Sequence, residues 1–186
     1  MDPFSTPPQD RDAVIRDRQN AVIARMQADP EAARSTIVTT AVVGEGLACN
    51  VRQGRFSALL DLGPGMGGDA AGPSPGFFGR AAIGGCVAMA VKMLAAREGV
   101  RFRRVTATVE TDFDDTALFG LGASSAAPTE TRVIVTVVTD ADPAVVDDIV
   151  ARTLDMDPWF LALRDPQRVR TTVRTTESEA VMVPGQ

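Results

Sequence analysis

The amino-acid sequence predicts an α+β protein in which an antiparallel sheet surrounds one long apolar helix. Runs of β-branched residues occur at 35–62, 99–113 and 131–139, and Gly- and Pro-rich segments typical of turns separate them. Helical patterns lie between and after these runs without the regular alternation of parallel α/β folds. The length of 186 residues suits one domain with an added N-terminal element.

The N-terminal element is a predicted helix over residues 8–28. Thr6 fits an N-cap, Pro7 a first helical residue and Gln9 a capping-box glutamine, while Asp29-Pro30 would end the helix. We expect a surface helix that packs on a partner or on the sheet. Residues 35–62 then predict three antiparallel strands with a turn at 53–54.

The central element is a long helix over residues 76–98 that is apolar nearly all round, which is typical of a helix buried on most sides. Gly79, Gly84 and Gly85 cost about 1 kcal/mol each relative to alanine. We expect these glycines to allow close approach of another backbone, such as a second central helix across a dimer axis.

The rest of the chain completes the α+β pattern. Strands at 99–113 and 131–139 are joined by an extended hairpin loop, in which Asp112, Asp114 and Asp115 should form a solvated strand end. A helix at 143–154, the short segment DPWFLALRDP and a final strand at 169–177 follow. We therefore divide the chain into a helical extension at 1–30, a main domain at 31–180 and a tail at 181–186.

Composition excludes several classes of function. The chain has no histidine, which excludes His-dependent nucleophilic catalysis and His-containing metal sites, and two cysteines alone make a poor metal site. The segment GPGMGGDAAGPSP matches G-x-G-x-x-G, but no helix begins at its third glycine. We predict neither a metal nor a cofactor.

Charge and hydropathy also argue against nucleic-acid and membrane partners. A net charge of −5, no tyrosine and one tryptophan oppose nucleic-acid binding. Arg80 and Lys92 interrupt the most apolar run, so no membrane partner is predicted, and the first residues lack a secretory pattern. We expect a cytoplasmic protein with reduced cysteines.

Cys86 is the candidate reactive residue, and two interpretations of it stay open. It shares a helical face with small and apolar side chains, so it is either a buried hydrophobic residue or an activated thiol. It lies too far along its helix for the helix N-terminus to lower its pKa. Arg52 and Arg55 are the nearest candidates for activation, and Cys49 would meet Cys86 if the sheet packs on the helix.

The order of elements and the segment GFFGRAAIGGCVAMAVKMLAAREGVRFRRVTATVE resemble the OsmC/Ohr family over about residues 36–176. The resemblance implies an intertwined homodimer with two central helices between β-sheets. It also implies a reactive cysteine on the central helix, a glutamate near the start of that helix, an arginine from the strand meander and a resolving cysteine on the second helix. Cys86 matches the reactive cysteine of the central helix. The family's proline-glutamate motif falls at Pro75-Gly76, without the glutamate, and the second helix has no cysteine.

Two functions follow from this resemblance. The first is a cysteine-dependent peroxidase with Cys86 as nucleophile, in which Cys49 acts as an unusual resolving thiol or an external thiol serves as reductant. Arg52 or Arg55 would stabilise the thiolate. The organic hydroperoxide would lie in an apolar pocket lined by Phe77, Phe78 and Trp159.

The second function is a binding protein whose pocket holds a small apolar or anionic ligand. A different Cys86-dependent reaction on a sulfur compound is a lesser alternative. Rapid alkylation of Cys86 at neutral pH would favour the enzyme, and slow alkylation the binding protein.

Overall fold

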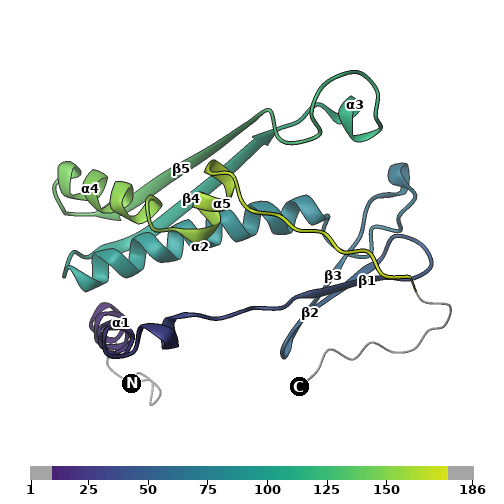
Figure 1. Cartoon of the computed structure of the whole chain (residues 1–186). Helices are drawn as coiled ribbons and strands as arrows, with labels where there is room; N and C mark the ends of the chain where they lie inside the picture. Colours follow the sequence, from purple (N-terminus) through teal and green to yellow (C-terminus); the bar gives the residue numbers. More distant parts are fainter. Residues whose placement is uncertain (1–9, 176–186) are drawn as a thin grey trace, which may run out of the picture.

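The computed structural model describes residues 10–175 and confirms the α+β class (Figure 1). Its strands are all antiparallel and form two separate sheets, one of three strands and one of two. In chain order the elements are α1 Arg11–Ala28, η1 Pro30–Ala33, β1 Thr40–Val43, β2 Cys49–Gln53, β3 Phe56–Leu60, η2 Pro64–Met66, α2 Pro75–Arg97, β4 Phe102–Asp112, α3 Asp115–Leu118, β5 Glu130–Thr139, α4 Pro143–Leu154 and α5 Pro158–Arg164.

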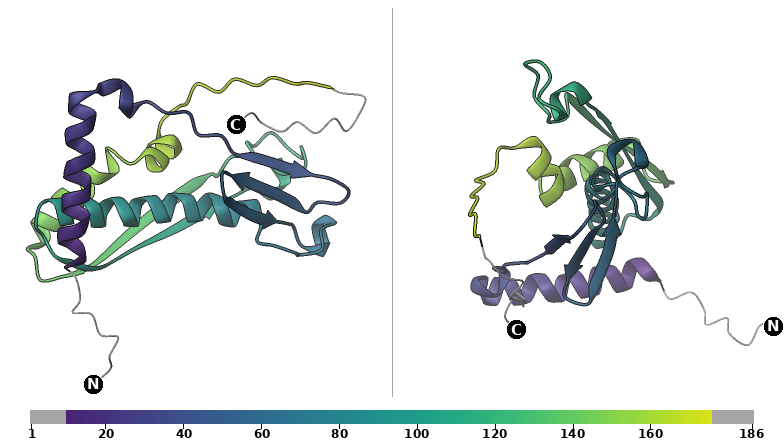
Figure 2. Two further views of the ribbon diagram at one scale, coloured as in Figure 1. Left: turned by 90° about the horizontal axis from the view of Figure 1, so that it is seen from below. Right: turned by 90° about the vertical axis from the view of Figure 1, so that its right-hand side faces the viewer.

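The predicted central helix is α2, and it organises the core. The hairpin of β4 and β5 covers one side of α2, α4 and α5 cover another, and α1 crosses near its C-terminal end (Figures 1 and 2). Alternate residues of β4 face the helix, as a half-buried strand requires. The fully or nearly fully buried hydrophobic side chains around this junction are Val87, Val91, Leu94, Ala95, Phe102 and Ile149.

One of the three predicted helix glycines has the expected close contact, but with a strand rather than with a second helix. A Cβ atom at Gly84 would lie 3.3 Å from Val109 Cγ2 and 3.4 Å from the Ala107 carbonyl oxygen of β4. Gly79 and Gly85 have open space around them within the single chain. By length and composition α2 could cross a membrane, yet it packs here as a core helix against β4, α1, α4 and α5.

The predicted meander is confirmed as the sheet β1–β2–β3. Cys49 of β2 lies opposite Val43 and Leu60, and Gly54 takes a positive φ of 54° in the turn between β2 and β3. The sheet lies beyond the N-terminal part of α2 instead of along the whole helix (Figure 2). As a result, Val42, Val43 and Phe56 are more than half exposed.

The glycine-rich loop after β3 folds around a carboxylate of its own chain. Asp61 is buried, and its Oδ1 accepts from the backbone N–H of Leu62 at 2.8 Å. Its Oδ2 accepts from the N–H groups of Asp69 and Ala71, both at 3.0 Å. A Cβ at Gly68 would lie 2.2 Å from the Leu62 carbonyl oxygen, so the loop needs glycine there. The backbone N–H groups of this loop therefore bind a carboxylate of the same chain, whereas those of a dinucleotide-binding loop bind phosphate.

The N-terminal helix begins later than predicted. Asp10 is the N-cap of α1 and accepts from the N–H groups of Asp12 and Ala13, so the helix starts at Arg11. The proposed cap at Thr6 lies outside the described residues. The helix packs on α2, where Lys92 Nζ is 2.7 Å from Asp12 Oδ1 and also donates to the Phe102 carbonyl oxygen.

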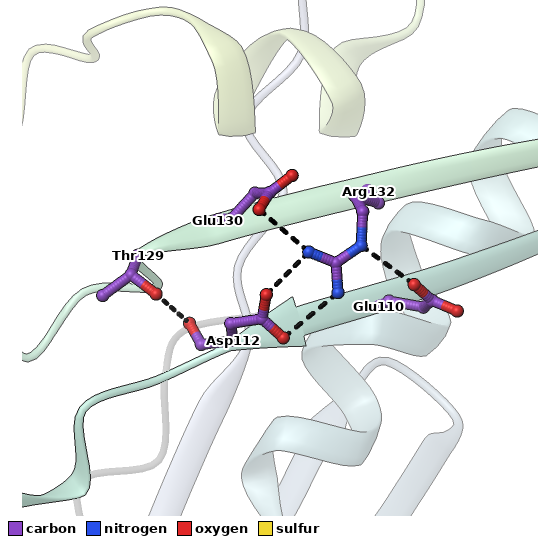
Figure 3. A network of polar contacts seen from close by, with 5 residues as sticks. All are labelled: Glu110, Asp112, Thr129, Glu130 and Arg132. Atoms are coloured by element: carbon purple, nitrogen blue, oxygen red, sulfur yellow. Dashed lines mark hydrogen bonds and ion pairs between the residues drawn. The ribbon is translucent and has the colours of Figure 1, made fainter.

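The far end of the β4–β5 hairpin is held by Arg132 (Figure 3). Its guanidinium donates to Asp112 at 2.6 and 3.1 Å and to Glu110 at 2.9 Å, and lies 3.0 Å from Glu130. Asp112 is therefore paired rather than only solvated. The predicted loop contains the short helix α3, because the side chain of Asp114 caps it by accepting from Thr116.

The helix at 143–154 has the predicted bounds, and the short segment after it is the helix α5. The predicted final strand is wrong for the described residues, because 166–175 form no strand. Val169 and Val173 are 82% and 85% exposed. A strand needs a neighbouring strand for its backbone hydrogen bonds, and the single chain places none beside this segment.

Candidate functional site at Cys86

Cys86 lies near the middle of α2, on the side that faces α5. The helix begins at Pro75 because Ser74 caps it, its Oγ accepting from the Phe77 N–H at 3.4 Å, and because proline is favoured in the first turn. The cysteine is partly buried and is not part of a disulfide. The packing of α5 on α2 decides which groups surround its sulfur.

Asp157 is the charged group that α5 brings to Cys86. It is the N-cap of α5, and its Oδ1 accepts from the N–H groups of Trp159 at 3.1 Å and Phe160 at 2.8 Å. The residue is only 1% exposed. Its second oxygen, Oδ2, is buried and has no hydrogen bond of regular geometry within residues 10–175.

The environment raises the pKa of the Cys86 thiol. Burial is the largest cause, followed by the hydrogen bond to Asp157 and the negative charge of that carboxylate. The backbone N–H of Trp159 acts in the opposite direction, because it stabilises the thiolate. Burial and the Asp157 carboxylate therefore both favour the neutral thiol of Cys86 over its thiolate.

The other predicted residues of the thiol site lie on the β1–β3 sheet. Cys49 is a partly buried free cysteine of β2, and Arg52 is exposed on the same strand. Arg55 lies in the following turn, with its guanidinium 5.0 Å from the centre of the Phe56 ring. Since α2 packs mainly on β4, α1, α4 and α5, the structure does not join these three residues to Cys86 within one chain. Their roles stay predictions.

The predicted pocket residues are divided between two sides of α2. Phe77 lines a cavity of about 250 Å³ against β4, together with Gly84 and Val109. Phe78 contacts Phe77 edge-on with ring centres 5.2 Å apart, and is not among the residues that line this cavity. Trp159 lies on the α5 side, where its backbone N–H faces Cys86 and its side chain is 56% exposed.

Asp157 is the site residue that the sequence analysis missed. A signal was present, because an aspartate followed by proline before an apolar run is typical of a helix N-cap. A capping carboxylate uses one oxygen on the backbone and leaves the other for a neighbour. Within residues 10–175, no three His, Cys, Asp or Glu side chains are grouped so that they could hold a metal ion.

A long apolar helix that carries a partly buried cysteine and packs on an antiparallel hairpin defines an α+β protein with a thiol site on its central helix. The family model described as OsmC-like protein matches residues 67–172, and the chain belongs to this family. A search of curated proteins found no match to this sequence.

Solved structures of this family have the same fold. An OsmC-like protein from Mycoplasma pneumoniae is 14% identical, with a TM-score of 0.60 over 70% of this chain and 88% of that one. An organic hydroperoxide resistance protein from Elizabethkingia anophelis is 16% identical, with a TM-score of 0.53 over 70% and 89%. A Psychrobacter arcticus protein, described as a putative osmotic stress induced and detoxification response protein, is 12% identical, with a TM-score of 0.54 over 68% and 88%. Together with the family model, these matches show that the chain has the OsmC-like fold.

Proposed function

We propose that this protein is a homodimeric thiol peroxidase in which Cys86 reduces a hydroperoxide and Asp157 accepts the proton of the thiol. Two observations of Asp157 carry this proposal: its carboxylate raises the pKa of the partly buried Cys86 thiol, and its buried Oδ2 has no hydrogen-bond partner within residues 10–175. A carboxylate beside a thiol can act as a general base even when the thiol is protonated at equilibrium.

The chemistry balances as Cys86–SH + ROOH → Cys86–SOH + ROH. The sulfur attacks the terminal peroxide oxygen, and the O–O bond breaks with its electrons going to the leaving alkoxide. Asp157 Oδ2 takes the thiol proton during the attack, and this proton then neutralises the alkoxide. The Trp159 N–H would stabilise the negative charge that develops on sulfur.

An external thiol is the proposed reductant. The sulfenic acid of Cys86 has no second thiol beside it in the same chain, since Cys49 lies on the other sheet. Two molecules of a small thiol would convert it back to the thiol, giving a disulfide and water. Without them the sulfenic acid would be oxidised further to sulfinic acid. The predicted cytoplasmic location would supply such thiols.

The exposed surface supports the homodimer. The chain exposes 14457 Å², whereas a compact monomer of 19.6 kDa exposes about 8,600 Å². Even if the 20 residues outside the described range were fully extended, they would add only about 3,000 Å². The remaining excess is as large as the surface that obligate partners bury.

The exposed apolar side chains of α2 also support a homodimer. Phe77, Met89 and Met93 are exposed apolar side chains of this helix, with exposures of 52%, 63% and 41%. The β1–β3 sheet also has exposed apolar side chains. We propose that a second copy covers these surfaces, and that Arg52 or Arg55 approaches Cys86 from that copy.

The raised pKa of Cys86 favours a second candidate function. A thiol that burial and a carboxylate keep protonated is a poor nucleophile unless a base assists it. If Asp157 only holds the thiol in place, the protein is an OsmC-family binding protein for a small apolar or anionic ligand.

The test is intact mass after one equivalent of cumene hydroperoxide, followed over time at neutral pH. We expect one oxygen atom on Cys86, gained faster than by N-acetylcysteine, reversed by dithiothreitol and absent from Cys86→Ser. The Cys49→Ser variant is the matched control and should react as the parent does.

Loss of two hydrogen atoms in place of oxygen gain, abolished by Cys49→Ser, would instead indicate a Cys49–Cys86 couple and refute the external reductant. Oxidation no faster than that of N-acetylcysteine would refute the peroxidase and leave the binding protein.

A further inference from the structure

A second cavity is lined by residues of α1, α2 and the segment 99–103. These parts meet where the start of α1 crosses the turn between α2 and β4 (Figure 2). The volume of this cavity is about 770 Å³, which is within the usual range of small-molecule sites. Three segments form it. They are the first turns of α1, the last turns of α2 around Lys92 and Ala96, and residues 99–103.

The lining of this cavity is strongly basic. Five of its eleven residues are cationic, and only Asp10 and Asp12 are acidic, so the lining carries a formal charge of +3. Over the whole chain, by contrast, acidic residues exceed basic ones and the net charge is −5. A basic cavity on an acidic protein concentrates anions and is not explained by the average composition. The five cations are Arg11, Arg16, Lys92, Arg101 and Arg103.

Ion pairs neutralise part of this charge. Asp12 is paired with Lys92 at 2.7 Å, Arg16 lies 3.7 Å from Asp17, and Arg103 is paired with Asp140. Arg11 and Arg101 have no ion-pair partner within the part of the chain that the structure describes. Two guanidinium groups from different segments therefore line one cavity with their charge unmatched.

We propose that this cavity binds a phosphate-bearing small molecule with two or more negative charges. The planar guanidinium groups of Arg11 and Arg101 would donate paired hydrogen bonds to phosphate oxygens. Lys92, whose side chain is only 29% exposed, holds the start of α1 against α2 through its ion pair with Asp12. The site depends on α1 and not on Cys86, so it is independent of the proposed peroxidase.

The test is calorimetric titration of the full chain with inorganic pyrophosphate, ADP and citrate. We expect pyrophosphate or ADP to bind more tightly than citrate, with affinity falling as salt is added. The double variant Arg11→Gln/Arg101→Gln should lower the affinity about tenfold or more, because two charge-assisted contacts are lost. The double variant Arg18→Gln/Arg104→Gln removes the same charge outside the cavity and should change the affinity less than about twofold.

Binding of pyrophosphate as tight as that of ADP would mean that the phosphate groups alone are recognised. Tighter binding of ADP would mean that the rest of the nucleotide also makes contacts. Three results would overturn the proposal. They are absence of binding by both phosphate compounds, tighter binding of citrate, and equal loss of affinity in the two double variants.

Discussion

The Cys86 thiol meets the Asp157 carboxylate at the point where α5 begins, and this contact helps to keep the thiol protonated. Asp157 combines two roles, since its Oδ1 caps the helix and its carboxylate raises the pKa of the Cys86 thiol. A second thiol at this place would resolve a sulfenic acid as a disulfide. A carboxylate can only move protons, so in the proposed peroxidase regeneration of the thiol would need a separate reductant.

The first prediction concerns Asp157→Asn in a Cys49→Ser background. Asparagine is also a good N-cap, so α5 should persist while the negative charge beside sulfur is lost. The pKa of Cys86 should fall, and each unit of that fall gives about tenfold more thiolate at neutral pH. Alkylation by iodoacetamide should therefore accelerate severalfold, whereas oxidation by cumene hydroperoxide should not accelerate in parallel, because the proton acceptor is gone.

Asp155→Asn is the matched control for this experiment, because Asp155 is an exposed carboxylate close in sequence and pairs with Arg164. It should leave both rates unchanged. Equal alkylation rates for the parent and Asp157→Asn would contradict the effect of Asp157 on the thiol. Acceleration of both reactions by Asp157→Asn would contradict its role as proton acceptor.

The second prediction concerns Met89→Glu and the homodimer. Met89 is 63% exposed in the single chain, so a glutamate there should not disturb the fold of the monomer. It would place a charge in the proposed contact along α2, where desolvation is costly. Light scattering should find a dimer for the parent and a monomer for Met89→Glu, with unchanged circular dichroism. Ala151→Glu, at an exposed position of α4, should remain dimeric. If Met89→Glu is also dimeric, the interface lies elsewhere.

The fold was largely predictable because each element has a local signal. The long apolar helix and the helix at 143–154 depend on neighbours in sequence, and the structure agrees with both; the turn predicted at 53–54 lies one residue later, at 54–55. The start of α1 was placed too early because Pro7 and Asp10 both give N-terminal signals, and the structure uses Asp10. The strand at 169–177 failed within residues 169–175 because strand formation depends on a partner that the pattern cannot name.

The candidate site was predictable only in part. Cys86 could be found because it is one of two cysteines in the chain and lies on the long apolar helix. Asp157 could not be joined to it from spacing alone, since the two residues meet only through the packing of α5 on α2. Asp61 was missed for a similar reason, because its partners are backbone N–H groups of a loop.

The third prediction concerns the pH dependence that Asp61 gives to the glycine-rich loop. The backbone N–H of Ala71, then that of Leu62, holds the pKa of Asp61 below its ordinary value of 3.8. Because the folded-state pKa is lowered, its stabilisation is present above the ordinary pKa and is lost as pH falls through the folded-state value. Asp61→Asn should therefore be less stable than the parent at pH 7, and the difference should shrink below about pH 4.

Urea unfolding at a series of pH values measures this difference. Asp69→Asn changes an exposed carboxylate of the same loop, and it should follow the parent at every pH. A constant gap between Asp61→Asn and the parent from pH 7 to about pH 3 would mean that shape, and not the charge of Asp61, holds the loop.

The fourth prediction concerns Arg132→Gln at the end of the β4–β5 hairpin. Arg132 holds down the pKa of Asp112 and contacts two further carboxylates, so its loss leaves three like charges close together. The group is partly exposed, so the effect should be local. Hydrogen exchange should accelerate severalfold at 113–129 while the core strands keep their protection, and added salt should reduce the difference.

Arg104→Gln removes an arginine that has no ion pair within residues 10–175, and it should leave the exchange of this loop unchanged. If Arg132→Gln also leaves it unchanged, the backbone hydrogen bond from Thr129 to Asp112, at 2.8 Å, is enough to close the hairpin.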